Sequence, residues 1–274
     1  MLSALGDGGD TTMRALELGA VDFVRKPARG DSVDLATLRE RLLGALRTAM
    51  LARYRSVPVL ARPVRAVGRG PVLGTPGAPS HLVVIAASTG GPRALAEIVP
   101  ALIPETAAVV VAQHMPSGFT ESLARRLDAL AVVPVREARH DEPLLAGRIY
   151  VAPGGVHTTI VGPADAPRLR VCAGPPVHGV APAADPLFES AADVFGHRTI
   201  AAVLTGMGHD GATGARRVRE AGGHVVVQDE STCIVFGMPH AAIQAGGADE
   251  MAPLSEIAVA IARALRARGC DAES

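Results

Sequence analysis

The sequence predicts an α/β fold in which a doubly wound, mostly parallel sheet carries helices on both faces. After about residue 80, short continuously apolar runs alternate with amphipathic helical patterns. Continuous apolar runs are typical of strands buried on both faces, and their alternation with helices indicates a parallel sheet. The strand-like runs are 82–86, 107–112, 199–204 and 224–228, and the helical patterns are 92–101, 117–128, 185–195, 210–221 and 236–245. A last apolar stripe at Leu254, Ile257, Ile261 and Leu265 predicts one more helix on that sheet.

The first part of the chain, residues 1–50, predicts only a fragment of a domain. Asp10 to Leu18 is typical of a short helix closed by Gly19, and Val21 to Val24 of a strand stopped by Lys26-Pro27. A helical stripe follows at Leu35, Leu38, Leu42, Leu46 and Met50. So short a segment ordinarily buries too little surface to fold alone, and a lone strand leaves bare edges.

Residues 51–80 have the composition of an extended linker. They contain five prolines, four glycines and five arginines, with no acidic residue and no apolar periodicity. The linker separates the N-terminal fragment from a larger predicted domain over residues 81–268.

The overall composition excludes several classes of protein. Apolar residues make up 48% and charged residues 20%, as in soluble globular proteins, and 27 basic residues balance 27 acidic ones. This balance argues against nucleic acid or anionic lipid as a partner. Three scattered cysteines predict neither a disulfide framework nor a zinc site, and we expect a cytoplasmic protein with no signal peptide and no membrane insertion.

Three polar residues follow the predicted strands where open α/β sheets bind their ligands. Ser88 follows the strand 82–86, His114 the strand 107–112, and Asp210 the strand 199–204. A serine hydroxyl needs an imidazole to take its proton, and a carboxylate holds that imidazole in the right tautomer. Ser88 also precedes a helix beginning near Pro92, whose free N–H groups would face a developing oxyanion.

Plainer interpretations of the same residues stay open at this point. Ser88 and Asp210 are both types that cap helices, Asp210 directly before the helix that starts at Gly211, and His114 could be an ordinary loop residue. His209 is a rival base, and Asp229 is a rival acid.

A nucleotide-binding loop is a second possible function for the glycine-rich turn after the first strand. That class needs an acidic residue closing the second strand, where Gln113-His114 stands, and the sequence has no GxxxxGK[ST] stretch. A lipase-type hydrolase is also disfavoured, because the GxSxG elbow is missing and the order is Ser, His, Asp.

With these residues in place, the run from Leu82 to Ala262 resembles the catalytic domain of the chemotaxis methylesterase family, CheB. The motifs that carry the resemblance are Ala87-Ser88-Thr89-Gly90-Gly91, Gln113-His114-Met115-Pro116 with Gly118-Phe119-Thr120, Tyr150-Val151-Ala152-Pro153-Gly154 with His157, Thr205-Gly206-Met207-Gly208-His209-Asp210-Gly211, and Gln228-Asp229-Glu230 through Phe236-Gly237-Met238-Pro239. Their number and order make an accidental match implausible.

The resemblance implies a protein-glutamate methylesterase that acts on the cytoplasmic helices of methyl-accepting chemoreceptors. Ser88 would attack the glutamyl methyl ester, His114 would shuttle the proton and Asp210 would orient His114, with backbone donors near Thr89 and Met207 stabilising the oxyanion. The same acyl-enzyme route would deamidate receptor glutamines. No cofactor and no metal is implied. The competing class is a non-catalytic signalling or binding module built on a hydrolase-like domain.

The N-terminal fragment resembles the end of a response-regulator receiver domain. Ser3 stands at the position of the switch hydroxyl and Lys26-Pro27 at that of the lysine-proline pair. The phospho-acceptor aspartate would lie in the absent first half, and Asp22 is not at its position, so we expect either a truncated receiver or a misplaced start of the chain. A histidine kinase would be a further partner only of a complete receiver. Departures from the family pattern are Ala86 before the turn, Val180-Ala181 where basic residues are frequent, and His240 in place of a lysine.

Overall fold

A computed structural model describes residues 2–3, 11–12, 15–16, 20–26, 35–51, 77–104 and 106–269. Its centre is a seven-stranded parallel sheet with the strand order β12-β11-β10-β3-β4-β7-β5. The strands are β3 (His81–Ala87), β4 (Ala107–Gln113), β5 (Val135–Glu137), β7 (Arg148–Val151), β10 (Thr199–Val203), β11 (His224–Gln228) and β12 (Glu250–Ala252). From β3 the chain first adds β4, β5 and β7 on one side of β3. It then crosses over and adds β10, β11 and β12 on the other side, so the strand order reverses between β3 and β10.

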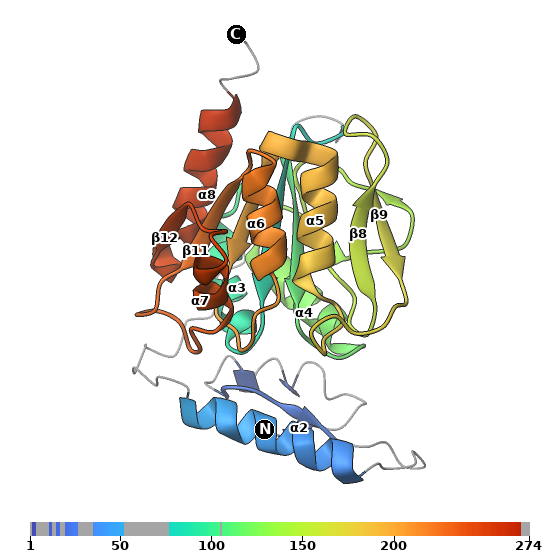
Figure 1. Cartoon of the computed structure of the whole chain (residues 1–274). Helices are drawn as coiled ribbons and strands as arrows, with labels where there is room; N and C mark the ends of the chain where they lie inside the picture. The colour runs from blue at the N-terminus through green and yellow to red at the C-terminus, as the bar shows by residue number, and fades with distance from the viewer. Residues whose placement is uncertain are drawn as a thin grey trace.

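Helices cover both faces of this sheet, as Figure 1 shows. Alternate β3 side chains divide between two cores: Val83 and Ile85 pack on one face, and Leu82 and Val84 on the other. The first face carries α3 (Gly91–Ile98), α4 (Phe119–Leu130) and α8 (Leu254–Gly269), and the second carries α5 (Ala184–Phe195), α6 (Ala212–Glu220) and α7 (Met238–Gln244). All β3 side chains are buried, which explains why the sequence of a two-sided strand lacks polar alternation. The predicted doubly wound α/β fold is confirmed.

A second, antiparallel sheet lies beside α5 and was not among the predicted elements. It has the order β6-β9-β8, formed by β6 (Glu142–Pro143), β9 (Arg168–Cys172) and β8 (His157–Val161). Ile160 and Leu169 point from it into the core on the second face, and the Ile160 N–H donates to Ser190 Oγ of α5 at 3.0 Å. Short 3-10 turns at η1 (Val99–Ala101) and η2 (Gly196–Arg198) extend α3 and α5.

The described N-terminal residues form a small separate layer. β1 (Leu2–Ser3) pairs in parallel with β2 (Val24–Arg25), and α2 spans Leu35–Leu51. The stripe that predicted α2 is confirmed as helix, whereas the strand predicted at 21–24 is wrong in its bounds, because pairing with β1 begins only at Val24. Of the helix predicted at 10–18, only 11–12 and 15–16 are described, both helical, and residues 52–76 of the predicted linker lie outside the described residues.

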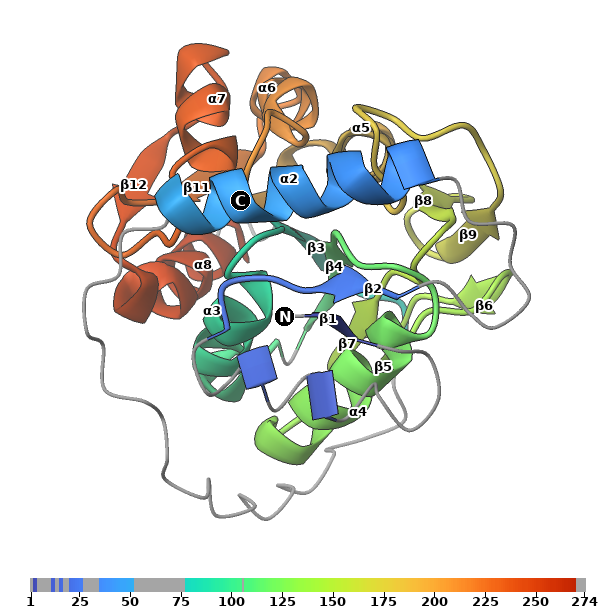
Figure 2. The ribbon, with the colours of Figure 1, turned by 90° about the horizontal axis from the view of Figure 1, so that it is seen from below.

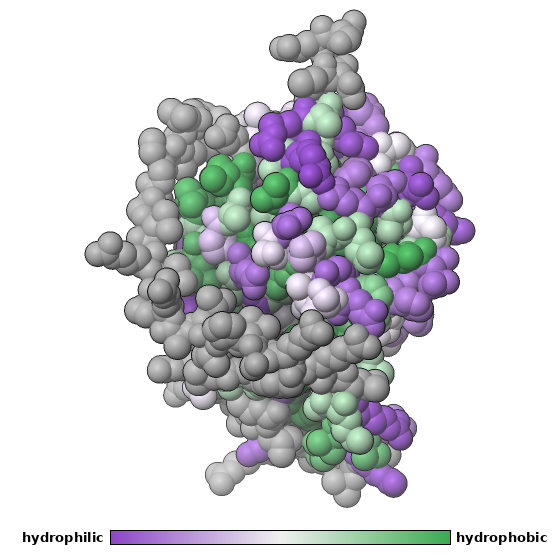
Figure 3. All heavy atoms as spheres, turned by 90° about the vertical axis from the view of Figure 1, so that its left-hand side faces the viewer, coloured by the Kyte–Doolittle hydropathy of each residue, from purple (hydrophilic) through white to green (hydrophobic). Residues whose placement is uncertain are grey.

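The layer lies at one end of the molecule, with α2 in front when that end is viewed directly (Figure 2). Apolar atoms are exposed at the lower end in Figure 3, where α2 lies. Among the α2 side chains that the structure describes, the large apolar ones that are exposed are Leu42, Leu43, Leu46 and Met50. No helix within the described ranges combines the length and the apolar character needed to cross a membrane.

Candidate active site

Ser88 lies in the turn that joins β3 to α3, at the carboxyl end of the sheet. Its N–H donates to the Thr205 carbonyl at 3.0 Å, and its own carbonyl accepts from the Gly91 N–H at 2.7 Å and from Gln113 Nε2 at 3.0 Å. Gly90, with φ of 81°, is the N-cap residue of α3 and adopts a conformation that favours glycine. Three separate chain segments therefore fix the backbone of Ser88.

The loop after β10 packs directly against Ser88. A Cβ at Gly206 would lie 2.7 Å from Ser88 Cβ and 2.4 Å from Met238 Sδ, so only glycine fits there without displacement. Thr205 also ties the two loops together, because its hydroxyl donates to the Thr89 carbonyl at 3.0 Å.

His114 and Asp210 form a buried hydrogen-bonded pair. His114 Nε2 lies 2.6 Å from Asp210 Oδ2, and the side chains are 9% and 3% exposed. His114 directly follows β4, and its N–H donates to the Ala87 carbonyl beside Ser88. Because Asp210 is bonded to Nε2, the remaining ring nitrogen, Nδ1, is the one available to a serine proton.

The carboxylate of Asp210 is held by the first turn of α5 as well as by His114. The N–H of Ala184 donates to Oδ2 at 2.6 Å, and that of Asp185 donates to Oδ1 at 3.1 Å. Burial by itself raises the pKa of Asp210, but the hydrogen bond and charge of His114 and these two N–H groups outweigh burial and hold the pKa below its ordinary value of 3.8. Asp210 is therefore ionised at neutral pH, the form that orients an imidazole.

Asp210, His209 and Asp229 have contacts that differ from the alternative roles that the sequence left open. Gly211 is the N-cap residue of α6, which has no side-chain cap, so Asp210 caps the distant helix α5 and not the helix that follows it. His209 is exposed, and its ring contacts His178 at a centroid distance of 4.4 Å. Asp229 bonds within its own turn, accepting from the N–H and hydroxyl of Thr232.

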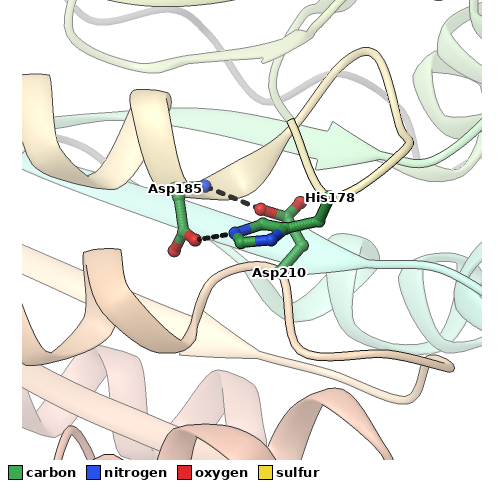
Figure 4. Close-up of side chains that lie close together, drawn as sticks. All are labelled: His178, Asp185 and Asp210. Carbon is green, nitrogen blue, oxygen red and sulfur yellow. Dashed lines mark hydrogen bonds and ion pairs between the residues drawn. The ribbon is translucent and has the colours of Figure 1, made fainter. Parts of the chain in front are cut away.

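A second histidine–carboxylate pair lies beside Asp210 (Figure 4). His178 Nε2 is 2.8 Å from Asp185 Oδ2, while Asp185 Oδ1 accepts the N–H of Gly214 at 2.7 Å. His178, Asp185 and Asp210 each offer a metal-ligating atom within 4.8 Å of the others. The carboxylate oxygens already accept hydrogen bonds, so the cluster is accounted for as a hydrogen-bond network that links α5, α6 and the loop before α5.

The two predicted oxyanion donors, Thr89 and Met207, lie next to Ser88 and Gly206 in the chain. Thr89 directly follows Ser88 and is 8% exposed, and its N–H has no acceptor among the described residues. Met207 follows Gly206, the residue in contact with Ser88, and its side chain is 48% exposed.

A small cleft opens beside Ser88 and His114, and the N-terminal layer forms one wall of it. One wall includes Ser88, Gln113 and His114, and the N-terminal wall includes Leu16 and Phe23. The Phe23 ring packs on Phe119 of α4 at a centroid distance of 4.6 Å. The sequence predicted no contact here, and it placed Gln113 in the histidine motif without giving it a role, although its place as the last residue of β4 was an available signal.

Comparison with known proteins identifies the family. The model for the family described as CheB methylesterase matches residues 83–261. A protein-glutamate methylesterase/protein-glutamine glutaminase of Symbiobacterium thermophilum is 44% identical over 94% of this chain and 74% of its own length, and one of Pyrococcus horikoshii is 40% identical over 97% and 73%. The crystal structure of the Thermotoga maritima CheB methylesterase catalytic domain superposes with a TM-score of 0.63 at 42% identity, covering 65% of this chain and 95% of that one. The resemblance inferred from the motifs is thus confirmed, and the chain belongs to the CheB methylesterase family.

Proposed function

We propose that the chain is a protein-glutamate methylesterase that works through an acyl-enzyme on Ser88. The observation that carries the proposal is the hydrogen-bonded pair of His114 and Asp210, 2.6 Å apart, in the loops that follow β4 and β10, the strands on either side of β3. An ionised carboxylate that holds an imidazole beside a serine is the arrangement that activates a hydroxyl nucleophile. The names of the relatives support glutamyl methyl ester as the substrate.

In this mechanism each residue has one task. His114 Nδ1 takes the Ser88 proton as Oγ attacks the ester carbonyl, while Asp210 stabilises the imidazolium. The N–H groups of Thr89 and Met207 hold the oxyanion of the tetrahedral intermediate. The proton on His114 then passes to the departing methoxide, which leaves as methanol, and a water molecule activated by His114 releases the free glutamate.

Deamidation of glutamine follows from the same steps. An amide differs from the ester only in its leaving group, so ammonia would depart in place of methanol and the acyl-enzyme would be identical. Both relatives carry the glutaminase activity in their names.

The partners we propose are the cytoplasmic helices of methyl-accepting chemoreceptors, met in the cytoplasm. Residues 81–268 would be the catalytic domain, with residues 1–50 a receiver-like fragment and 51–80 a linker. None of the proposed steps requires a cofactor or a metal ion.

The direct test compares the serines at the two ends of β3. Ser88→Ala should abolish methanol release from methylated receptor and labelling by a fluorophosphonate, detected by mass at residue 88. Ser80→Ala is the matched control, because Ser80 is exposed at the opposite end of the same strand. It should retain both signals.

Full turnover by Ser88→Ala would overturn the mechanism. The alternative, a non-catalytic binding module, predicts no labelling of the wild-type protein and no methanol release. Labelling at Ser88 together with turnover would exclude that alternative.

A further inference from the structure

We propose that Gln113 is a positioning residue that aims the Thr89 N–H at the oxyanion. The inference rests on the proposed function and deepens it, because it names the residue that holds one oxyanion donor in place. It is carried by the hydrogen bonds of the Gln113 amide, by peptide geometry and by the fit of Gln113 against Gly91.

Gln113 joins the nucleophile turn to the histidine loop. The residue is 1% exposed, and its Nε2 donates to the Ser88 carbonyl at 3.0 Å and to the His114 carbonyl at 3.3 Å. One amide group thus holds the backbones of both the proposed nucleophile and the proposed base. β4 places it there, because Gln113 is paired in register with Ala87, the residue before Ser88.

The Ser88 carbonyl and the Thr89 N–H belong to the same peptide group. A trans peptide is planar, so its C=O and N–H point in opposite directions. When Gln113 Nε2 and the Gly91 N–H fix the direction of the Ser88 carbonyl, they also fix the direction of the Thr89 N–H. The hydroxyl of Thr205 holds the next carbonyl, that of Thr89, so the peptide groups on both sides of Thr89 are held.

The carbonyls of Ser88 and His114 fix which way the Gln113 amide faces, and Gly91 leaves room for the oxygen on its other side. Gln113 Oε1 is buried with no hydrogen-bond partner in the described part of the chain. A Cβ at Gly91 would lie only 2.0 Å from it, so a glycine is needed to accommodate this oxygen. The opposite amide orientation would set Oε1 against two carbonyl oxygens, which have no hydrogen to donate. A buried acceptor left unpaired calls for an explanation, and we infer that it is retained because the Nε2 side holds the oxyanion peptide.

The proposal predicts a loss that appears in kcat and not in KM. Gln113→Met keeps the length and apolar bulk of the side chain but removes the donor, and kcat should fall about 10- to 100-fold, less than the loss of a whole oxyanion donor. KM should stay within about twofold, since the oxyanion forms only after substrate has bound.

A second variant separates positioning from simple packing by its pH profile. In Gln113→Glu, a protonated carboxyl can still donate to the Ser88 carbonyl, whereas the carboxylate cannot. The ratio of variant to wild-type kcat should therefore be highest at low pH and fall as the pH rises and the new carboxyl ionises. Packing damage alone is measured by the uncharged Gln113→Met variant, whose ratio to wild type should not change with pH.

Thr199→Val is the matched control for loss of a buried hydrogen bond. Thr199 is 0% exposed, donates to the Ala191 carbonyl at 3.1 Å, and lies at the amino end of β10, away from Ser88. It should lower the thermal midpoint while leaving kcat unchanged.

The outcomes distinguish this inference from the proposed function. A Gln113→Met variant with wild-type kcat, or a Gln113→Glu ratio that is flat with pH, overturns the role of Gln113 even if Ser88 is labelled by fluorophosphonate. Failure of the wild-type protein to be labelled at Ser88 overturns the proposed function itself.

Discussion

The two histidine–carboxylate pairs of this protein are similar in their bonds and different in their surroundings. His114 and Asp210 are 2.6 Å apart and His178 and Asp185 are 2.8 Å apart, and both aspartates are buried. The His114 side chain is 9% exposed at the end of β4, beside the Ser88 turn. The His178 side chain is 29% exposed and lies on the two-residue turn between Val177 and Val180.

Under the proposed function, only one of these two short histidine–aspartate bonds holds a base. What distinguishes the pairs is what lies beside them: His114 lines the same cleft as Ser88, whereas the His178 ring contacts the exposed ring of His209. The pairs are nevertheless joined, because the backbone N–H of Asp185 donates to Asp210 Oδ1. The backbone of Asp185 thus helps to hold Asp210. The following variants test whether His114 and Asp210 act in the chemistry while His178 and Asp185 act in stability.

The largest effect is expected from His114→Ala. Loss of the base in a coupled triad should lower kcat for methanol release on the order of 10⁴- to 10⁶-fold, with folding retained by near-ultraviolet circular dichroism. Equal losses from His114→Ala and His178→Ala would show that the two pairs do not divide the roles in this way.

Asp210→Asn should have the next largest effect. It preserves the shape of the side chain but removes the charge that selects the tautomer of His114, so kcat should fall on the order of 10³- to 10⁴-fold. Single-turnover rates of fluorophosphonate labelling would measure the same loss at the nucleophile.

The lowered pKa of Asp210 also predicts a pH dependence of stability. Because the folded-state pKa lies below the ordinary value of 3.8, ionised Asp210 contributes stability that is fully present above that value and is lost as the pH falls through the folded-state pKa. Urea unfolding of wild type and Asp210→Asn should therefore give a stability difference that narrows as the medium is acidified below pH 3.8. A difference that is constant from neutral pH into this acid range would contradict the assigned pKa direction.

Asp185→Asn should affect stability more than chemistry. Its carboxylate ties α5 to α6 through the Gly214 N–H and accepts from His178, so its loss should cost about 1–3 kcal/mol of unfolding free energy. The backbone N–H that supports Asp210 remains in this variant, and kcat should therefore fall much less than in Asp210→Asn. A loss of kcat equal to that of Asp210→Asn would place Asp185 in the chemistry.

The smallest effects are expected from His178→Ala and His209→Ala. His209 is exposed, and a substitution at such a position usually changes stability by no more than about 0.5 kcal/mol. His178→Ala removes the donor to the buried Asp185 carboxylate and should cost somewhat more, about 1 kcal/mol. Turnover should be unchanged in both. If His209→Ala were the damaging substitution and His114→Ala were not, the base would be His209.

Sequence patterns correctly predicted the elements whose burial can be inferred from the composition of a short segment. The runs that became β3 and β4 are apolar on both faces, and His114 and Asp210 follow strand ends, where parallel sheets bring distant side chains together. The sequence could not show that Asp210 accepts from α5 and not from its own helix, because that depends on how α5 and α6 are packed.

Two other regions lacked a clear local signal. β8 and β9 are short and carry polar residues such as Thr159 and Arg170, as expected for strands with one exposed face, so they did not stand out as apolar runs. In α2 the apolar stripe predicted a helix correctly, but Leu46 and Met50 are exposed, because a stripe is buried only where a neighbouring element covers it.

The distance along the chain between the members of the site has a consequence for folding kinetics. His114 and Asp210 are separated by 96 residues, and they meet only when β3, β4 and β10 are already side by side. Contacts between residues so far apart in sequence form late and slow the folding of a chain. Recovery of fluorophosphonate reactivity at Ser88 should therefore follow completion of the sheet, lagging behind the recovery of helix measured by far-ultraviolet circular dichroism.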